Sequence, residues 1–300
     1  MNSILWPALP LEEWKDTYAT LHMWTQVVGK ICLAQTPLIN HWWNVPLYVT
    51  AHGLTTSTLP YRGRALEIDF NFIDHQLLIQ CDDGATETIA LAPRSVAEFY
   101  RMVMRTLHGL GIEVKIWPVP VEVTDPIPFE EDHKNASYDA DYANRFWRIL
   151  VQCDRLFKQF RSGFVGKCSP VHFFWGSFDL AVTRFSGRRA PERPGADRIT
   201  VEGYSHEVIS GGFWPGSGNI AGPAFYAYAA PEPLEYSRSR VQPSSAFYNP
   251  PTKGFILMYD DVRKADDPDQ MVLDFLQSTY EAGAELGKWD RRNLERDAKL

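Results

Sequence analysis

Apolar residues recur along the chain at two spacings, and each spacing predicts a different kind of element. Over residues 12–28 they lie three or four positions apart, which predicts an amphipathic helix. Over residues 45–91 apolar and polar residues alternate instead, as in strands that expose one face. Turn-like segments divide this region into the runs 45–51, 66–72, 77–79 and 89–91. The pattern therefore predicts a helix followed by an antiparallel meander.

A second helix is predicted over residues 95–110, where Ser95 and Glu98 have the spacing of a capping box and Gly111 follows as a stop. Residues 112–123 then predict a further strand. The next segment, 125–140, is rich in proline and acidic residues, which is typical of a connector between two folded units.

After this connector the same order of elements returns. A helix is predicted over residues 141–161 and a strand over 172–185, followed by an exposed loop over 187–198. Shorter strands follow at 199–210, 224–229 and 255–259, broken by Gly/Pro-rich loops at 211–222 and 231–251, and a closing helix is predicted over 268–286.

Two segments of the chain also resemble each other residue by residue. The segment His41–His52 aligns without gaps on His172–Thr183, and both begin with a histidine and two aromatic residues before an alternating run. Upstream, each copy has a Val-Gly-Lys sequence, at 28–30 and 165–167, followed by a cysteine and a proline. Because an internal repeat at long spacing determines the architecture, we expect two related halves.

We therefore predict an internally duplicated α+β fold, in which two pseudo-symmetric halves each contain a helix, an antiparallel sheet and a closing helix. The expected boundaries are residues 1–124 for the first half, 125–140 for the connector and 141–300 for the second half, together forming one compact unit. At the level of fold alone, this is similar to TATA-binding-protein-like and helix-grip proteins, in which a curved sheet backs onto helices. Paired halves commonly place a ligand site at their shared seam.

Composition narrows the class of protein. Hydrophobic residues make up 45% of the chain and aromatic residues 13%, which indicates a packed globular protein. The net charge of −7 argues against nucleic-acid and anionic-membrane partners, because both favour clustered lysine and arginine. No apolar stretch reaches the roughly 18 residues of a membrane span and no secretory signal is recognisable, so we expect a cytoplasmic protein. Four scattered cysteines without a C-x-x-C pair do not indicate a disulfide framework.

The repeated strand is expected to have a core face and an open face, because side chains alternate along a strand. His41 and His172 fall on the predicted core face. The predicted open face carries aromatic and polar residues, namely Trp42, Tyr48 and His52 in the first half and Trp175, Ser177 and Asp179 in the second. Such a mixture is typical of a small-molecule pocket. Glu67 and Asp69 on the next strand are expected on the same polar face; a purely solvated face would explain these two but not the tryptophans.

Asp179 is the most informative of these candidates. If it lies between the halves, burial would raise the pKa of its carboxyl, unless it meets a cation such as Arg184 or a hydrogen-bond donor. His206 and Glu207 are further candidates, but adjacent residues of a strand point to opposite faces, so only one of them enters a given pocket. A triad of Ser177, His206 and Asp179 would lack the Gly-x-Ser-x-Gly motif that supports such an assignment.

Metal and phosphate chemistry have weaker support. Pseudo-symmetry could bring His41 and His172 together as metal ligands, but at strand starts on an apolar face a histidine bonded to backbone is commoner. We therefore predict no metal site. The glycines of 211–222 match neither the Walker pattern nor Gly-x-Gly-x-x-Gly, and no particular cofactor is indicated.

Four segments carry a family resemblance: Trp-Pro-Ala-Leu-Pro at 6–10, Asn-His-Trp-Trp at 40–43 with Pro-Leu-Tyr-Val-Thr at 46–50, Pro-Ile-Pro-Phe at 126–129, and Lys-Cys-Ser-Pro-Val-His-Phe-Phe-Trp-Gly-Ser-Phe-Asp at 167–179. Together they resemble the bacterial proteins catalogued as domain of unknown function 5996. The resemblance spans nearly the whole chain and implies a free-standing bacterial cytosolic protein. It implies no reaction and no catalytic residue, since none is assigned to that family.

Three functions stay open at this point. The leading hypothesis is a protein that encloses a small, partly apolar ligand or substrate between its halves, through Trp42, Tyr48, His52, Glu67, Asp69, Trp175 and Ser177. Alternatively, a hydrolase or metal-dependent enzyme would use His206 with Asp179 or Glu207 as catalytic residues. A third possibility is a scaffold whose aromatic face forms a homodimer interface.

Overall fold

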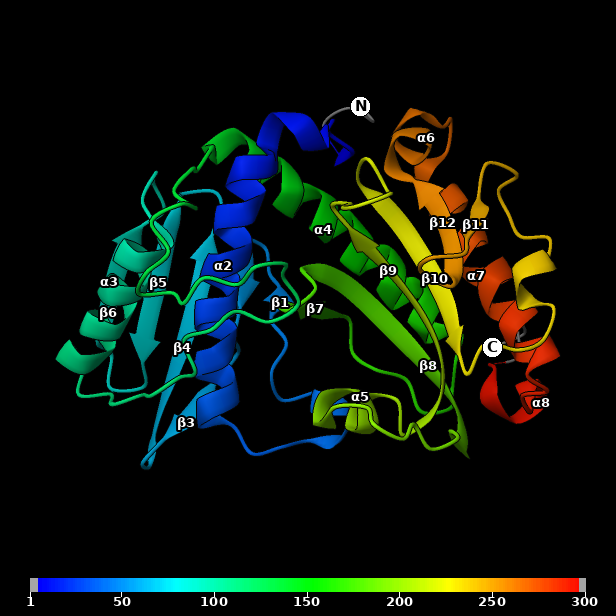
Figure 1. Ribbon diagram of the computed structural model, residues 1–300, viewed down its shortest axis with the longest axis horizontal. Coiled ribbons are helices and arrows are strands. Elements are labelled where there is room, and N and C mark those ends of the chain that lie inside the picture. Colours follow the sequence, from blue (N-terminus) through cyan, green and yellow to red (C-terminus); the bar gives the residue numbers. More distant parts are fainter. Residues whose placement is uncertain (1–4, 297–300) are drawn as a thin grey trace.

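The computed structural model describes residues 5–296 and contains two separate antiparallel sheets of six strands each. In Figure 1 the first sheet lies on the left with helices α2 (Leu11–Gln35) and α3 (Val96–Gly109). The second sheet lies on the right with helices α4 (Ala140–Ser162) and α7 (Pro268–Leu286). The predicted α+β class is confirmed, and each half has its own sheet.

Helix α2 extends past the predicted 12–28 and contacts helices of both halves, α3 and α4. Every residue from Thr20 to Cys32 is buried, on all sides of the helix. A helix that is buried all round shows no single apolar stripe. This burial is the reason why the helical spacing of apolar residues could not reveal the last turns.

The first sheet is the meander predicted from alternation. Its strands are β1 (Tyr48–Val49), β2 (Gly53–Thr55), β3 (Leu59–Tyr61), β4 (Arg64–Asn71), β5 (Gln76–Cys81) and β6 (Thr86–Ala90). They are ordered β1-β2-β4-β5-β6, with β3 also paired to β4. Along β4, Leu66, Ile68 and Phe70 are buried while Glu67 and Asp69 are only partly buried, as alternation requires. The predicted run 45–51 is reduced to the two residues of β1.

Residues 112–123 do not form the predicted strand. The backbone of Val121 instead pairs with the side chain of Gln26, which donates to its carbonyl oxygen at 2.8 Å and accepts from its N–H at 2.9 Å. Lys30 donates to the carbonyl oxygen of Val119 at 2.7 Å. Backbone groups that bond to side chains of α2 need no neighbouring strand.

The proline-rich connector packs against the first half. Phe129 is fully buried, and Asp132 is almost so. The carbonyl oxygens of Asp132 and Asn135 accept from the N–H groups of Ala97 and Val96, in the first turn of α3. Because these N–H groups have no partner within the helix, the connector caps α3.

The strand predicted over 172–185 is a hairpin of β7 (His172–Phe174) and β8 (Asp179–Arg189). The turn over 175–178 shifts the register, so His172 pairs with Ala181. His172 therefore shares a face with Asp179, and the prediction that it shares the core face of Leu180 and Val182 is wrong.

The remaining elements are α5 (Arg198–Gly203), β9 (His206–Trp214), β10 (Ala224–Ala230), η2 (Tyr236–Arg238), β11 (Phe247–Asn249), β12 (Gly254–Met258), α6 (Tyr259–Lys264) and α8 (Arg291–Leu294). The second sheet has the order β11-β12-β10-β9-β8-β7. The strands predicted over 224–229 and 255–259 and the closing helix over 268–286 are confirmed.

Two predictions in this region are correct only in part. The strand predicted over 199–210 begins as helix α5, because the carboxylate of Asp197 accepts from the N–H groups of Ile199 and Thr200 and so starts a helix. The loop predicted over 211–222 is shorter than predicted, because Gly211 to Trp214 belong to β9.

The halves are joined by packing and by one pair of backbone hydrogen bonds. Leu47, the residue before β1, and Phe173 of β7 exchange N–H···O bonds of 2.9 Å each. A single hydrophobic cluster contains residues of both halves, such as Trp24, Phe70, Phe146 and Phe213.

Both halves run from a helix through six strands to a closing helix, which agrees with the predicted order. The repeated motifs, however, fold differently. The first Val-Gly-Lys lies within α2, and the second lies in the loop after α4. His41 lies in the 3-10 helix η1 (Asn40–Trp42) and does not begin a strand on the apolar face as predicted. The duplication therefore stays a prediction. Among residues 5–296, no helix has the length and apolar composition needed to cross a membrane.

Candidate functional site

The second sheet has one face covered by the long helices α4 and α7, whereas on its other face the short elements η1 and α5 cover only one end. Gly211, Phe213 and Phe225 point toward the helices, where Phe157 of α4 and Leu276 of α7 contact them. We call the other side the open face. Strand register places on it Asp179, Ala181, Thr183 and Phe185 from β8, Val208, Ser210, Gly212 and Trp214 from β9, and Ala224, Tyr226, Tyr228 and Ala230 from β10.

Asp179 is the acidic group of the open face. Only 8% of its surface is exposed. The hydroxyl of Ser177 donates to one of its carboxylate oxygens, and the phenol of Tyr226 donates to the other. Burial raises the pKa of Asp179, and these two hydrogen bonds act in the opposite direction.

Arg184 is not a partner of Asp179, although the sequence allowed it. Strand alternation directs Arg184 to the helix-covered side, where its guanidinium lies 3.5 Å from the ring centre of Phe160 and 4.3 Å from that of Tyr280. The partners of Asp179 are therefore hydrogen-bond donors and not a cation.

Glycine at position 212 allows Tyr226 to reach Asp179. Gly212 of β9 and Tyr226 of β10 lie directly opposite each other in the sheet. A Cβ atom at Gly212 would lie 2.3 Å from the Tyr226 hydroxyl and 2.6 Å from the carbonyl oxygen of Leu180. The tyrosine ring therefore crosses the strand where there is no side chain.

The turn before Asp179 rests on α2, so it lies at the seam between the halves. The indole of Trp175 covers Gly29, where a Cβ atom would lie 2.3 Å from the ring, and its N–H donates to the carbonyl oxygen of Val45 at 2.8 Å. His22 Nε2 lies 2.8 Å from the carbonyl oxygen of Gly176. Trp175 is thus a buried packing residue that fixes this turn, whereas Ser177 is exposed and bonds to Asp179.

A second carboxyl, Glu122, lies beside this turn. A Cβ atom at Gly176 would lie 2.5 Å from the Glu122 carboxyl oxygen. Burial raises the pKa of Glu122, and the charge of Asp179 adds to the rise. Burial followed by the charge of Asp179 also raises the pKa of Tyr18, on α2. The side chains around Asp179 therefore come from both halves.

Hydroxyl groups continue along the open face toward α5. Thr183 and Ser210 lie 2.9 Å apart, hydroxyl to hydroxyl. The phenols of Tyr204 and Tyr228 are also 2.9 Å apart, and the ring of Tyr228 stacks on that of Tyr226. Thr183, Tyr204, Tyr226 and Tyr228 are all partly exposed.

His206 lies at the far end of the face from Asp179. It pairs with Arg189 at the end of β8, while Asp179 begins that strand. At about 3.3 Å per residue, the two side chains are on the order of 30 Å apart. The structure therefore brings His206 neither to Asp179 nor to Ser177, and the triad drawn from the sequence is not assembled.

The His206 end contains a basic cluster. Lys167 Nζ lies 2.6 Å from His41 Nε2, and the His41 and His206 rings are 5.7 Å apart. Burial lowers the pKa values of all three groups, and the charge of Lys167 lowers those of the two histidines further.

The first-half candidates are spread over several places. Trp42 is partly buried in η1, with Arg198 over its ring at 5.6 Å. The Tyr48 hydroxyl is 3.4 Å from His172 Nε2, and His52 is exposed after β1. No contact joins any of them to Asp179 in the described part of the chain.

Glu67 and Asp69 share the helix-free side of the first sheet with Tyr48, as strand register shows. Thr55 donates to Glu67 at 3.0 Å. Burial raises the pKa of Asp69, and one of its buried carboxyl oxygens has no hydrogen-bond partner in the described structure. These carboxyls belong to a different sheet from Asp179.

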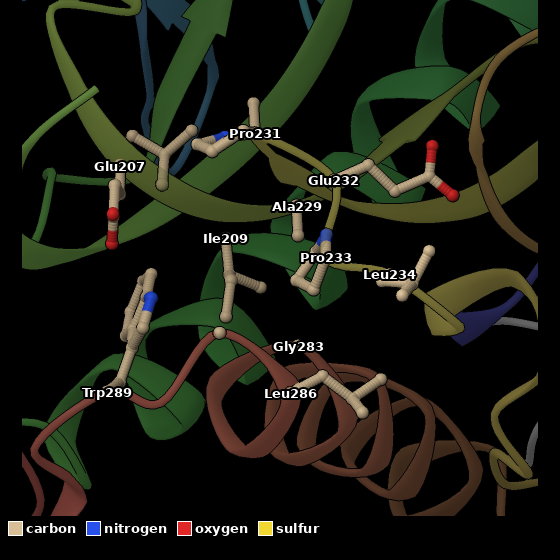
Figure 2. Close-up of a pocket in the computed structure, with 13 residues that line it drawn as sticks. Glu207, Ile209, Ala229, Pro231, Glu232, Pro233, Leu234, Gly283, Leu286 and Trp289 are labelled. Atoms are coloured by element: carbon tan, nitrogen blue, oxygen red, sulfur yellow. The ribbon is translucent and has the colours of Figure 1, made fainter. Parts of the chain in front are cut away.

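Glu207 points away from His206, as alternation predicts, and lines a cavity between β9, β10 and α7. Figure 2 shows Glu207 above Trp289, and Gly283 and Leu286 of α7 to the right of Trp289. Arg188 donates to the Glu207 carboxylate at 2.9 and 2.6 Å. The cavity volume of about 200 Å³ is below the roughly 300 Å³ of typical ligand pockets. Glu207 is therefore already paired beside a small cavity.

Among residues 5–296, no group of three or more His, Cys, Asp or Glu side chains is arranged to hold a metal ion. The absence of a metal site stays a prediction.

Comparison with known protein families assigns the chain to one of them, because one family model matches residues 6–296. The chain belongs to the family of unknown function DUF5996. No curated protein and no solved structure matches this family member.

Sequence reasoning missed three residues of this DUF5996 protein that the structure places either beside Asp179 or in the basic cluster with His41 and His206. Tyr226 was seen only as part of a strand, although alternation with Tyr228 could have placed both on one face. Glu122 lies in a segment predicted as a strand, and nothing in the sequence showed that it reaches Asp179. Lys167 was noticed only as part of the repeat.

Proposed function

We propose that this protein binds a small, partly apolar molecule on the open face of its second sheet, with Asp179 as the polar anchor. The observation that carries the proposal is the composition of that face. On β8, β9 and β10 this face carries no Lys, Arg or Glu except Arg189, which pairs with His206 where β8 ends. Partly exposed Tyr226, Tyr228 and Trp214 surround a buried carboxyl instead, which is how small-molecule sites are lined.

Asp179 keeps capacity for a ligand after its protein contacts are made. Each carboxylate oxygen can accept two hydrogen bonds, and Ser177 and Tyr226 use one on each. A ligand with an N–H or O–H group could therefore donate to Asp179, while its apolar part contacts the tyrosine rings. Glu122 and Tyr18 would limit the site from the first half.

His172 supports the same assignment. It lies on the same side of the sheet as Asp179 and is fully buried beneath Trp43 and Tyr48. Its Nδ1 has no hydrogen-bond partner within residues 5–296. Buried polar atoms in proteins are nearly always bonded, and an unbonded one needs an explanation, such as a bound molecule.

The test compares matched carboxyl variants on the two sheets. A library of small amphipathic compounds is screened by native mass spectrometry and thermal shift on the wild type, Asp179→Asn, Tyr226→Phe and the control Asp69→Asn. Compounds that bind the wild type should bind Asp179→Asn and Tyr226→Phe about tenfold more weakly, which corresponds to about 1.4 kcal/mol. Asp69→Asn should keep wild-type affinity.

Asp179→Asn should also remain folded, because the amide oxygen can accept one of the two hydrogen bonds and the amide NH2 can donate to the other hydroxyl oxygen. If binders are found and Asp179→Asn keeps their affinity while Asp69→Asn loses it, the site lies on the first sheet. If Asp179→Asn unfolds and folded molecules retain affinity, Asp179 is a structural residue.

A further inference from the structure

Lys167 occupies a position that the ligand site at Asp179 does not explain. Its carbonyl oxygen accepts from the Phe185 N–H at 3.0 Å, which fixes it beside β8. Its side chain crosses two aromatic rings, with Nζ 4.8 Å from the ring centre of Phe185 and 5.3 Å from that of Trp43. The amine then reaches His41 Nε2, 2.6 Å away.

The contacts of His41 define which nitrogen faces the lysine. His41 Nδ1 lies 3.1 and 3.2 Å from the carbonyl oxygens of Glu202 and Gly203, in α5. Carbonyl oxygens only accept, so Nδ1 carries the hydrogen and Nε2 presents a lone pair to Lys167. The backbone N–H of His41 donates to the Glu202 carboxylate at 3.1 Å, which fixes the ring from a second direction.

The backbone at this point is held in an unusual conformation. His41 and Trp42 have φ angles of 59° and 60°, in the left-handed region that favours glycine. Two consecutive strained residues persist only where surrounding contacts hold them, and such strain concentrates at functional sites. Figure 1 shows α5, whose contacts hold His41, below β8.

Lys167 has no carboxylate partner in an ion pair within the described residues. The charged or titratable groups around it are His41 from η1, His206 from β9, and Glu202 from α5. Burial lowers the pKa of Lys167, and the more distant charge of Glu202 opposes that change. More of the amine is therefore free at neutral pH than for an ordinary lysine.

We propose that Lys167 is a nucleophilic amine that condenses reversibly with an aldehyde or ketone, with His41 as its proton acceptor. Nucleophile and base lie within hydrogen-bond distance and the base is oriented by a third group, which is the arrangement that nucleophilic catalysis requires. This activity goes beyond ligand binding at Asp179 and does not depend on it.

The step balances without any further reagent. The Lys167 ammonium passes a proton to His41 Nε2, and the nitrogen lone pair forms a bond to the carbonyl carbon. The carbonyl oxygen takes up two of the three ammonium protons, one of them returned by His41, and leaves as water. The product is a protonated imine on Lys167, and hydrolysis reverses the reaction.

The test uses propionaldehyde with sodium cyanoborohydride, which reduces imines to stable secondary amines. The full-length protein is treated at pH 7, and peptide mapping by mass spectrometry gives the modification rate at each lysine. Lys115 and Lys253 are exposed internal references outside any ion pair of the described structure. We expect Lys167 to react about tenfold faster than either, although it is less exposed.

The variant His41→Gln should lower the rate at Lys167 about tenfold and leave Lys115 and Lys253 unchanged. Asp179→Asn should leave all three rates unchanged, so failure here is distinct from failure of the ligand site. If His41→Gln does not fold, the pH dependence of the wild type decides instead. The rate at Lys167 should then reach half its maximum at a lower pH than the rate at Lys253. A Lys167 rate no higher than the references, or a midpoint equal to theirs, would overturn the proposal.

Discussion

The sides of the two sheets that carry the polar residues have the same alternation but different chemistry. On the first sheet, short polar side chains bond to the adjacent strand or within a turn, as Thr55 of β2 does to Glu67 of β4 and Asn71 does to Asp74. On the second, tyrosine hydroxyls extend over neighbouring strands to Asp179 and Tyr204. Alternation alone therefore finds a polar face, and only residue type and long-range pairing distinguish a solvated face from a binding face.

The largest expected difference between the faces is in acid stability. Unfolded histidines titrate near pH 6.5, whereas burial lowers the pKa of His172 to about 3 and that of His22 to about 4. Below pH 6.5 the unfolded chain therefore binds protons that the folded protein does not, and stability falls as pH falls toward the folded values. At pH 5 each histidine should lower the unfolding free energy by on the order of 2 kcal/mol.

Urea denaturation at pH 7 and pH 5 measures this loss. His172→Gln and His22→Gln should each reduce the difference between the two pH values, while His52→Gln, at an exposed position beside the first sheet, should not. An unchanged difference in both buried-site variants would contradict the proton linkage.

A second prediction concerns the glycine beneath Tyr226. In Gly212→Ala the added methyl group would meet the Tyr226 hydroxyl and the carbonyl oxygen of Leu180, and the latter is backbone that cannot rotate away. We expect a loss of about 2 kcal/mol in unfolding free energy and weaker ligand binding. The control Gly109→Ala has nothing within 4 Å of the added carbon and should be stable. Equal stability of both variants would show that the open face tolerates repacking.

Tyr226→Phe should have a smaller effect. It removes one hydrogen bond to a buried carboxyl, which is worth about 1 to 2 kcal/mol. Because that bond opposes the burial-driven rise in the pKa of Asp179, its removal should raise this pKa further. Carboxyl titration by infrared spectroscopy, with Asp179→Asn to assign the band, measures the change; a lower pKa would contradict this account.

The smallest effect is expected on the first sheet. Thr55→Val removes the bond to the partly exposed Glu67 while keeping the shape of the side chain. The unfolding free energy should fall by about 0.5 kcal/mol, at the low end for a hydrogen bond. If Thr55→Val destabilises as much as Tyr226→Phe, the two faces do not differ in the way their contacts indicate.

The sequence predicted the elements whose signals are local. The helices α3, α4 and α7 and the meander of the first sheet followed from periodicity, capping and alternation. The hairpin at 175–178 was not visible, because Trp175 and Phe178 continue the alternating pattern through a turn that is held by α2. The same turn reversed the predicted face of His172.

The site could be predicted only in part for a similar reason. Asp179, Ser177 and His206 were sequence candidates for one site, but strand direction places His206 at the opposite end of β8 from the other two. Glu122 and Lys167 reach their positions through segments without regular structure, and their contacts depend on tertiary packing. No spacing rule connects Lys167 with His41 across more than a hundred residues of chain.

The complete burial of α2 has a consequence for synthesis of the chain. During translation the first half leaves the ribosome before Trp175 and its turn have been synthesised. At that stage helix α2, which is buried on all sides in the folded protein, lacks the side chain that covers Gly29. We expect the nascent first half to remain incompletely packed and open to chaperone binding until residue 175 and the following hairpin have emerged. A translational pause before that point would then lengthen the time during which the nascent chain exposes apolar surface and is prone to aggregate.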